Sequence, residues 1–259
     1  MDSAPRIDPL AAAFARVADA YDLGRKPYPP EPVNWAWQTL GLHSSATVVD
    51  LAAGTGKLSR LLAARGARVI AVEPLSEMRR VLVERVPLAE VVDGTAEQIP
   101  LPGEVADAVF VGEAFHWFDG NRALPEIHRV LRPGGGLAIV FGHSDWGDLP
   151  WNDEVDARLD QVRRPHVRPE NRPWTGLWRV PFERTELFSP LEVREFPMVL
   201  TFTVEEFQLM VSTWSFVAAL PEHDRESLLD DLGGIIHAHD IHRFDLRGSV
   251  TVHLTTKRE

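Results

Sequence analysis

The sequence predicts an α/β protein in which a mostly parallel, seven-stranded sheet carries helices on both faces, with an N-terminal helical flap and an inserted lid segment. Three observations lead to this fold class. From residue 46 onward, short apolar runs alternate with helical patterns, which favours parallel strands joined by right-handed crossovers. The stretch Thr47 to Lys57 reads as a buried strand, a loop of small residues and a helix N-terminus. A second acid, Glu73, ends the next apolar run about twenty residues later, where such folds place a carboxylate on a ribose.

Two helices are expected before the sheet. The first, 9–21, carries apolar side chains at helical spacing, and Pro30 starts the second, roughly 31–40. Two readings of this region stay open. The helices either cover one face of the sheet or form a flap in which Tyr21, Arg25 and Tyr28 touch a ligand.

The alternating region defines the sheet. Strands are expected near 46–51, 68–73, 89–93, 105–111 and 136–141, with helices near 56–65, 75–86 and 121–131. Ligands of such sheets bind beyond the carboxyl ends of the strands, at the point where the strand order reverses. The three glycines of the loop 132–136 suit a helix C-cap and a sharp turn, so we expect them to be structural.

After Phe141 the alternation stops. The segment 142–190 is rich in tryptophan, proline and arginine, which indicates an inserted lid. Its tryptophans, at positions 146, 151, 174 and 178, form either an aromatic acceptor pocket or a small core of their own. A strand over 191–200, helices over 204–219 and 222–238, and a last strand over 243–256 complete the chain, and antiparallel pairing is open to the last strand. We expect one domain, 1–259, divided into a flap 1–41, a core 46–142, the lid, and a C-terminal part 191–259.

Composition restricts the function further. The formal charge is −11, and no basic run is visible, which disfavours a nucleic-acid partner. The chain has no cysteine, so thiol catalysis and disulfides are excluded. We see neither a signal-peptide pattern nor a long apolar run, and therefore expect a cytoplasmic protein with no membrane association. The oligomeric state stays open.

The glycine loop has the character of a nucleotide-type site. Gly54 and Gly56 allow unusual backbone angles and bring N–H groups close to a ligand. A phosphate-binding P-loop is disfavoured, because Leu51 stands where its first glycine belongs and Leu58 where its Ser or Thr belongs. A nicotinamide dehydrogenase is disfavoured by the glycine spacing and by Asp50, the acid that closes the first strand.

These segments resemble the Rossmann-like class I S-adenosylmethionine (SAM)-dependent methyltransferases, particularly the small-molecule group that includes the type 11 and trans-aconitate methyltransferase-like proteins. The resemblance covers most of 20–142. Val48 to Gly56 is similar to the first family motif, although Ala52 stands where its first glycine is usual. We interpret this alanine as a sign that the position avoids positive φ. Arg129 to Gly136 is similar to the family's Arg-Val-Leu-Arg-Pro-Gly-Gly.

The resemblance implies that SAM is the cofactor and that the reaction is methyl transfer to a small-molecule acceptor. It places Glu73 on the ribose hydroxyls, Met78 at the adenine face, 93–97 at the adenine edge and 21–29 at the methionine end. The implied cofactor-binding residues are Tyr21, Arg25, Asp50, Ala52, Gly54, Gly56, Glu73, Pro74, Met78, Gly94, Thr95, Ala96, Glu97, Glu113, Ala114 and Phe115. The implied acceptor-binding residues are Tyr28, Trp117, Phe118 and Trp146.

His116 is the candidate catalytic base, because it follows the fourth strand and histidine titrates near neutrality. A base is needed only for an acceptor that is protonated at neutral pH. The alternative is a packing residue beside Trp117. Glu113 is expected to position the cofactor and Asp50 to hold the loop.

Other readings stay open. A protein of this fold that binds SAM without methyl transfer, as a cyclase or regulatory subunit, is the alternative function. The histidines at 237, 239 and 242 invite a metal reading, but no second cluster completes a site, so we expect a solvated helix end and no metal. The acceptor, and whether O, N or C is methylated, cannot be predicted.

Overall fold

The computed structural model describes residues 7–145, 147, 149–163 and 175–259. Its sheet has seven strands in the order β3-β2-β1-β4-β5-β7-β6. Their bounds are β1 Thr47–Leu51, β2 Arg68–Val72, β3 Glu90–Val92, β4 Ala106–Gly112, β5 Leu131–Asp145, β6 Glu192–Thr203 and β7 Arg243–Thr256. Strands β1 to β5 pair in parallel, and β7 is antiparallel to both β5 and β6. The predicted fold class is confirmed.

The strand order reverses between β1 and β4. Chain order runs outward from β1 through β2 to β3 on one side, whereas β4 lies on its other side. Val48 pairs with Ala108 and Asp50 with Phe110, so the carboxyl ends of the two strands lie next to each other. All five residues of β1 are buried, as expected for a central strand with both faces covered. The switch point where such sheets bind ligands is therefore at the ends of β1 and β4.

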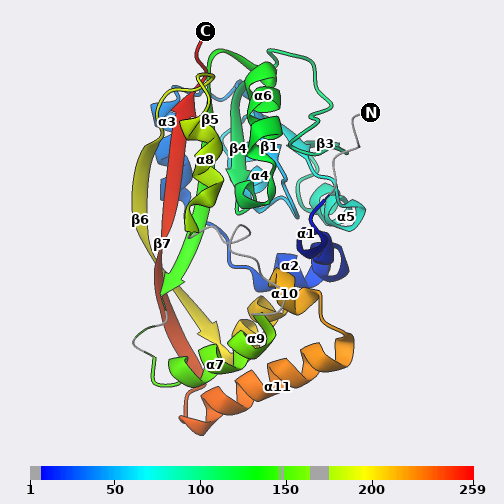
Figure 1. The fold of residues 1–259 in the computed structure, drawn as a ribbon, viewed down its shortest axis with the longest axis vertical. Helices are drawn as coiled ribbons and strands as arrows, with labels where there is room; N and C mark the ends of the chain where they lie inside the picture. The colour runs from blue at the N-terminus through cyan, green and yellow to red at the C-terminus, as the bar shows by residue number, and fades with distance from the viewer. Residues whose placement is uncertain (1–6, 146, 148, 164–174) are drawn as a thin grey trace.

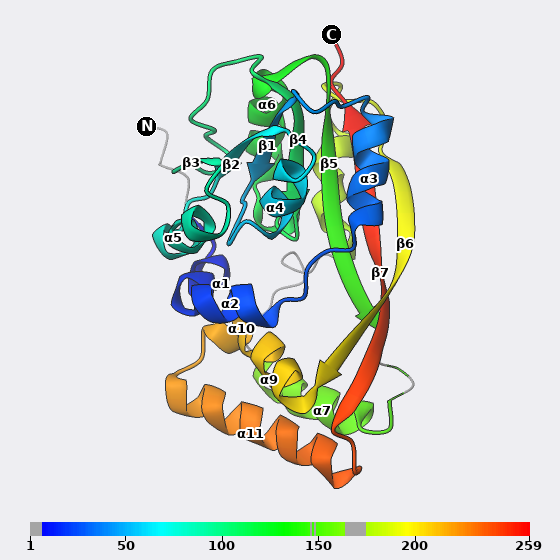
Figure 2. The ribbon, with the colours of Figure 1, turned by 180° about the vertical axis from the view of Figure 1, so that it is seen from behind.

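Helices cover both faces of the sheet (Figures 1 and 2). Helices α6 (Gly120–Val130) and α8 (Val180–Glu183) lie on one face, and α3 (Pro30–Thr39) and α4 (Lys57–Ala63) on the other. Helix α5 (Ser76–Arg85) follows β2. The short 3-10 turn η2 (Phe115–Trp117) follows β4, and a second one, η5 (Leu177–Arg179), directly precedes α8. We call β1 to β4 with α4, α5 and α6 the parallel half.

The N-terminal helix is broken rather than continuous. It consists of α1 (Pro9–Ala12), the 3-10 segment η1 (Ala13–Val17) and α2 (Ala18–Gly24). The backbone of Val17 leaves helical geometry, with φ −125° and ψ 22°. Gly24 lies so close to α9 (Val204–Ser212) that a Cβ there would be 2.9 Å from the carbonyl oxygen of Leu209. The helical spacing of apolar residues in the sequence does not indicate such a break.

The glycine loop after α6 differs from the prediction. Leu131 is already extended and pairs with Ala106, whereas Gly136 pairs with Ala108, so 132–135 bulge out of β5. A Cβ at Gly136 would overlap the side chain of Leu40 at 2.2 Å. The glycines thus form a bulge in a strand, not a helix cap, because they let a long strand pass close to its neighbours.

A helical layer lies beyond the parallel half (Figure 1). It consists of α7 (Asn152–Arg163), α9 (Val204–Ser212), α10 (Ser215–Ala218) and α11 (Glu222–Ala238). The long strands β6 and β7 run from the parallel half to this layer, as both views show. The predicted helix 204–219 is two helices, interrupted at Thr213 and Trp214.

The described tryptophans of the segment 142–190 pack into two different cores. Trp151 is fully buried in the helical layer against Phe207 and Phe244, with ring centroids 5.5 and 4.9 Å away. Trp178 packs against Phe115 and Phe141 in the core of the parallel half. The alternative in which these tryptophans form a small core of their own is therefore wrong for these two, because each packs against residues from outside the segment, Phe207 and Phe244 for Trp151 and Phe115 for Trp178. Trp146 and Trp174 lie outside the described residues, and the division of the chain into flap, core and lid stays a prediction.

Within the described residues, no helix combines the length and apolar character needed to cross a bilayer. The histidines near the end of α11 have local partners: His239 Nε2 lies 2.8 Å from Glu154 Oε1, and the rings of His237 and His242 are 5.5 Å apart. In the described ranges, no group of three or more His, Asp or Glu side chains is placed to hold a metal ion.

Candidate cofactor and acceptor site

The two glycines of the loop have different tasks. Gly54, at φ +57°, donates its N–H to Glu73 Oε2 at 2.8 Å, and a Cβ there would meet nothing within 4 Å. Gly54 therefore faces open space. Gly56, at φ +82°, donates its N–H to the Ala53 carbonyl, and a Cβ there would lie 2.8 Å from Val86. Close packing against α5 explains the second glycine.

The interpretation of Ala52 is wrong. Its φ is +57°, in the left-handed region that alanine rarely adopts. The turn holds the next residue in place, because Ala53 N–H donates to the Val72 carbonyl of β2 at 3.2 Å. Glu113, at the end of β4, also has φ +57°. Two residues other than glycine with positive φ thus lie at the ends of the two switch-point strands, and strained residues of this kind gather at functional sites.

A first cavity lies over the ends of β1, β2 and β4. Its lining is Ile7, Asp8, Ala11, Phe14, Tyr21, Ala52, Gly54, Glu73, Pro74, Leu75, Met78, Gly94, Thr95, Ala96, Glu97, Gly112, Glu113, Ala114, Trp117 and Phe118. Glu73 is held rigidly in this wall, because its carboxylate accepts the N–H groups of Gly54 at 2.8 Å and Leu75 at 2.9 Å. The predicted second acid thus lies beside the glycine loop.

A second cavity lies on the other side of the loop. Its lining is Tyr21, Arg25, Lys26, Pro27, Tyr28, Asp50, Ala52, Ala53, Gly54, Thr55, Lys57, Leu58, Gly112, Glu113, Gly142, Ser144, Met198, Leu200, Met210 and Val250. The two cavities share Tyr21, Ala52, Gly54, Gly112 and Glu113. They therefore adjoin at the switch point, between the end of β1 and the end of β4.

Two carboxyl groups in these walls, Asp50 and Glu73, are buried, and a third, Glu113, is partly buried. Burial raises the pKa of Asp50 to about 6, and that of Glu73 and of Glu113 to about 7. Asp50 accepts a hydrogen bond from the Ser59 hydroxyl at 2.5 Å, and Glu113 Oε1 accepts the Gly142 N–H. Burial disfavours the charged form of a carboxyl group. A positively charged ligand would therefore stabilise the ionised form of all three groups.

The structure brings most of the predicted site residues together. Of those that the structure describes, all line one of the two cavities except Gly56, Phe115 and His116. Phe115 is a core residue, packed against Trp178 and Phe182. Trp146 lies outside the described residues, so its predicted role stays a prediction.

His116 packs between rings rather than against either cavity. Its ring centroid lies 4.7 Å from that of Trp117 and 5.7 Å from that of Phe141. Burial lowers its pKa to about 4, so the ring is neutral at pH 7. Its Nδ1 is buried and has no hydrogen-bond partner among the described residues.

Sequence reasoning missed the far wall of the second cavity. Met198 and Leu200 come from β6, Val250 from β7 and Met210 from α9. In the sequence these residues look like ordinary core residues of strands and a helix, and only the strand order brings them to the glycine loop. Lys57 is adjacent to Gly56 in the sequence, but the sequence does not indicate that its side chain lines the cavity.

The strand order and the site at its switch point define an open, doubly wound α/β protein that binds its ligand at the glycine loop. Comparison with known proteins agrees. A methyltransferase domain family matches residues 49–139. An uncharacterized methyltransferase of Mycobacterium bovis is 40% identical over 185 residues, which cover 70% of this chain and 73% of that protein. The trans-aconitate 2-methyltransferase of Paracidovorax citrulli is 38% identical over 138 residues, 47% of this chain and 53% of that protein.

A solved structure from Anaeromyxobacter dehalogenans, described as a candidate type II methyltransferase, has a TM-score of 0.67 and 26% identity, and covers 90% of this chain and 97% of that one. The chain belongs to the class I SAM-dependent methyltransferases, and its cofactor is SAM.

The residues present fit this cofactor. SAM carries a sulfonium and an ammonium group, and the carboxyl groups of Asp50, Glu73 and Glu113 in the two cavities, with their raised pKa values, suit a cation. The open space above Gly54 admits a ligand close to the backbone. Met78, which is 2% exposed, offers an apolar surface in the first cavity.

Proposed function

We propose that this methyltransferase acts on a small-molecule acceptor, which enters the second cavity while the adenosine part of SAM lies in the first. The observation that carries the proposal is that the two cavities meet at Gly54, Gly112 and Glu113. A ligand that spans both cavities has its middle at this junction, and the sulfonium is the middle of SAM.

The residues of the first cavity hold the adenosine in this proposal. Glu73 accepts hydrogen bonds from the ribose hydroxyls, since its carboxylate already lies beside the glycine loop. Met78 packs on the adenine face, and 94–97 line its edge. Asp50, Tyr21 and Arg25 hold the amino-acid end of the cofactor at the entrance to the second cavity.

The bound cofactor supplies an electrophilic methyl group on a sulfonium. The chain's own contribution is alignment and the exclusion of water, since in-line transfer needs little covalent help from the protein. Tyr28 is partly buried in the wall of the second cavity, and a Cβ at Gly112 would lie 2.8 Å from its hydroxyl. This contact with Gly112 supports a role for the Tyr28 hydroxyl in orienting the acceptor at the junction.

We retain His116 as the candidate base, although it lines neither cavity and lies behind Trp117 of the first cavity. Its neutral ring keeps a lone pair available at pH 7, but burial makes it a weak proton acceptor. Such a base suits an acceptor that ionises readily, and a carboxylate acceptor needs none. The name of the Paracidovorax citrulli relative, trans-aconitate 2-methyltransferase, supports a small organic acid among the acceptors to be tested.

The acceptor end of the second cavity is apolar. Met198, Leu200 and Met210 form this wall together with Val250. Because such a surface is stabilised by contact with apolar atoms, the acceptor carries an apolar portion that faces it.

The test is a variant that closes this wall. Leu200→Glu places a charge among apolar side chains, and we expect it to lower S-adenosylhomocysteine formation by about tenfold or more with every acceptor turned over by the native chain. SAM binding, followed by thermal shift, should persist. Val199→Glu is the matched control, because this neighbouring side chain is 61% exposed.

Two results would contradict the proposal. If the native chain shows no thermal shift with SAM, the cofactor assignment to these cavities fails. If Leu200→Glu methylates the acceptors as fast as Val199→Glu, the acceptor does not bind in the second cavity.

A further inference from the structure

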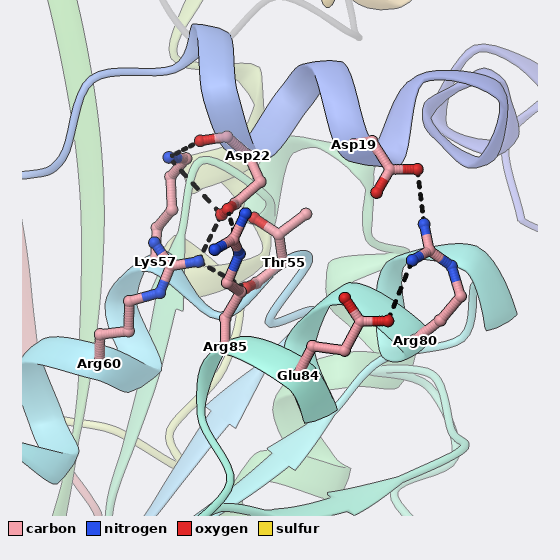
Figure 3. A network of polar contacts seen from close by, with 8 residues as sticks. All are labelled: Asp19, Asp22, Thr55, Lys57, Arg60, Arg80, Glu84 and Arg85. Carbon is pink, nitrogen blue, oxygen red and sulfur yellow. Dashed lines mark hydrogen bonds and ion pairs between the residues drawn. The ribbon is translucent and has the colours of Figure 1, made fainter.

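Helix α2 is fastened to the parallel half by one buried carboxylate, Asp22 (Figure 3). The Asp22 side chain is only 6% exposed, and Arg85 Nε lies 2.9 Å from its Oδ2. Arg60 donates a hydrogen bond to Oδ1, and Lys57 Nζ lies 3.9 Å from the same oxygen. These cations come from α4 and α5, so a single side chain joins three helices.

The backbone of α2 takes part in the same contact. Lys57 Nζ donates to the Asp22 carbonyl at 2.8 Å, and Arg60 Nη2 reaches the Thr55 carbonyl at 3.4 Å. The cluster therefore joins α2 directly to the glycine loop. Burial opposes ionisation of Asp22, but the hydrogen bond and charge of Arg60, with the charge of Lys57, outweigh it and hold the pKa below its ordinary value.

The residues that directly follow α2 fasten it to the helical layer. Arg25 Nε donates to the Thr213 hydroxyl at 2.8 Å, and Lys26 Nζ lies 2.7 Å from Glu206 Oε1. Together with the close approach of Gly24 to Leu209, these contacts make α2 a bridge across the mouth of the site.

Next to these contacts, α2 and its C-cap residue present two side chains to the cavities. Tyr21 lines both cavities and Arg25 lines the second, and the Arg25 guanidinium lies 5.3 Å from the Tyr21 ring centroid. Residues four apart share one face of a helix, whereas Asp22 projects in another direction. Asp22 itself lines neither cavity.

We propose that Asp22 is a positioning residue, and that its cluster with Arg60, Arg85 and Lys57 is a latch that holds α2 over the bound cofactor. The latch keeps Tyr21 and Arg25 against the site and slows the departure of the cofactor. The proposal rests on the cofactor position given above, and it goes beyond it by naming the contact that controls exchange.

The same helix offers a matched control. Asp19 also pairs with an arginine of α5, with Arg80 Nη2 at 2.5 Å. Asp19 is 73% exposed and Arg80 48% exposed, so this pair lies in water and contributes little. Asp22 and Asp19 thus differ in burial, while the residue type, the helix and the class of partner are the same.

The experiment compares Asp22→Asn, Asp22→Glu and Asp19→Asn in the full chain. We expect Asp22→Asn to raise the dissociation rate of S-adenosylhomocysteine and its Kd by about tenfold or more, measured by stopped-flow tryptophan fluorescence and calorimetry. At saturating SAM, kcat should change by less than about twofold, because the reacting atoms are untouched. Asp22→Glu should recover part of the affinity, and Asp19→Asn should match the native chain.

A second variant covers the case in which Asp22→Asn does not fold. Arg85→Gln removes one cation from α5, away from both cavities, and should raise the dissociation rate in the same direction. Native affinity and dissociation rate in both Asp22→Asn and Arg85→Gln would overturn the latch. So would a fall in kcat with no change in Kd. The native chain's own binding of SAM separates this outcome from a failure of the cofactor assignment.

Discussion

At the scale of single residues, Ala52 shows that a turn can impose a conformation which the residue itself disfavours. A left-handed alanine costs about 1–2 kcal/mol, and the hydrogen bond from Ala53 to β2 keeps it there. The sequence gives only a weak indication of this conformation, namely that related proteins usually have glycine at this position. Our interpretation of the alanine was wrong.

Glycine at position 52 should therefore stabilise the cofactor-free chain. Ala52→Gly removes the left-handed penalty, and we expect the free energy of unfolding to rise by about 1 kcal/mol in denaturant titration. Ala53→Gly is the control. Ala53 is not among the residues with positive φ, so glycine there should lower the stability by about 0.5–1 kcal/mol. Equal effects of the two changes would show that the turn stores no strain.

The buried carboxyl groups make cofactor binding depend on pH. Free Glu73 and Glu113, with pKa values of about 7, are mostly protonated below neutrality, and a bound cation favours their ionised forms. The complex therefore holds fewer protons than the free protein, so affinity for SAM should rise as pH increases from 6 to 7.

Calorimetry in buffers of different ionisation enthalpy checks this, and we expect release of about one proton or more near pH 6. Glu113→Gln should reduce the number released. Proton uptake, or no exchange in that pH range, would contradict the assignment of these carboxyl groups to the cofactor site.

At the scale of elements, strands were predicted better than helix continuity. The periodic pattern located β1 to β4, α11 (Glu222–Ala238) and β7 (Arg243–Thr256) closely, because buried apolar runs and strong amphipathic periods are local properties. It missed the break at Val17 and the bulge after Leu131, which depend on partners distant in sequence such as Leu40.

The candidate site divides in the same way. The glycine loop and Glu73 belong to a short segment with its own signature, so their neighbourhood could be predicted. The wall of Met198, Leu200 and Val250 could not, because β6 and β7 reach the site only through their place in the sheet. Asp22 could not be distinguished from any other acid on a helix, since its burial depends on α4 and α5.

At the scale of the whole molecule, two cores share one set of strands. Strands β6 and β7 run through both (Figure 2). Trp151 fills the second core. We expect Trp151→Ala to lower the free energy of unfolding by about 3–5 kcal/mol, in a single transition, since the shared strands couple the halves.

Circular dichroism and tryptophan fluorescence should then report the same midpoint in denaturant. Val193→Ala, on the exposed side of β6, is the control, with an expected effect of less than about 0.5 kcal/mol. Two separate transitions in the Trp151 variant would show that the helical layer unfolds on its own.

The position of β7 between β5 and β6 also affects how the molecule is made. Its neighbours in the sheet are both synthesised before it, so on the ribosome they stand apart, each with an unpaired edge, until the final strand emerges and inserts between them. Assembly of this side of the sheet is therefore complete only after synthesis has passed Thr256, and until then the unpaired edges of β5 and β6 can pair with other chains.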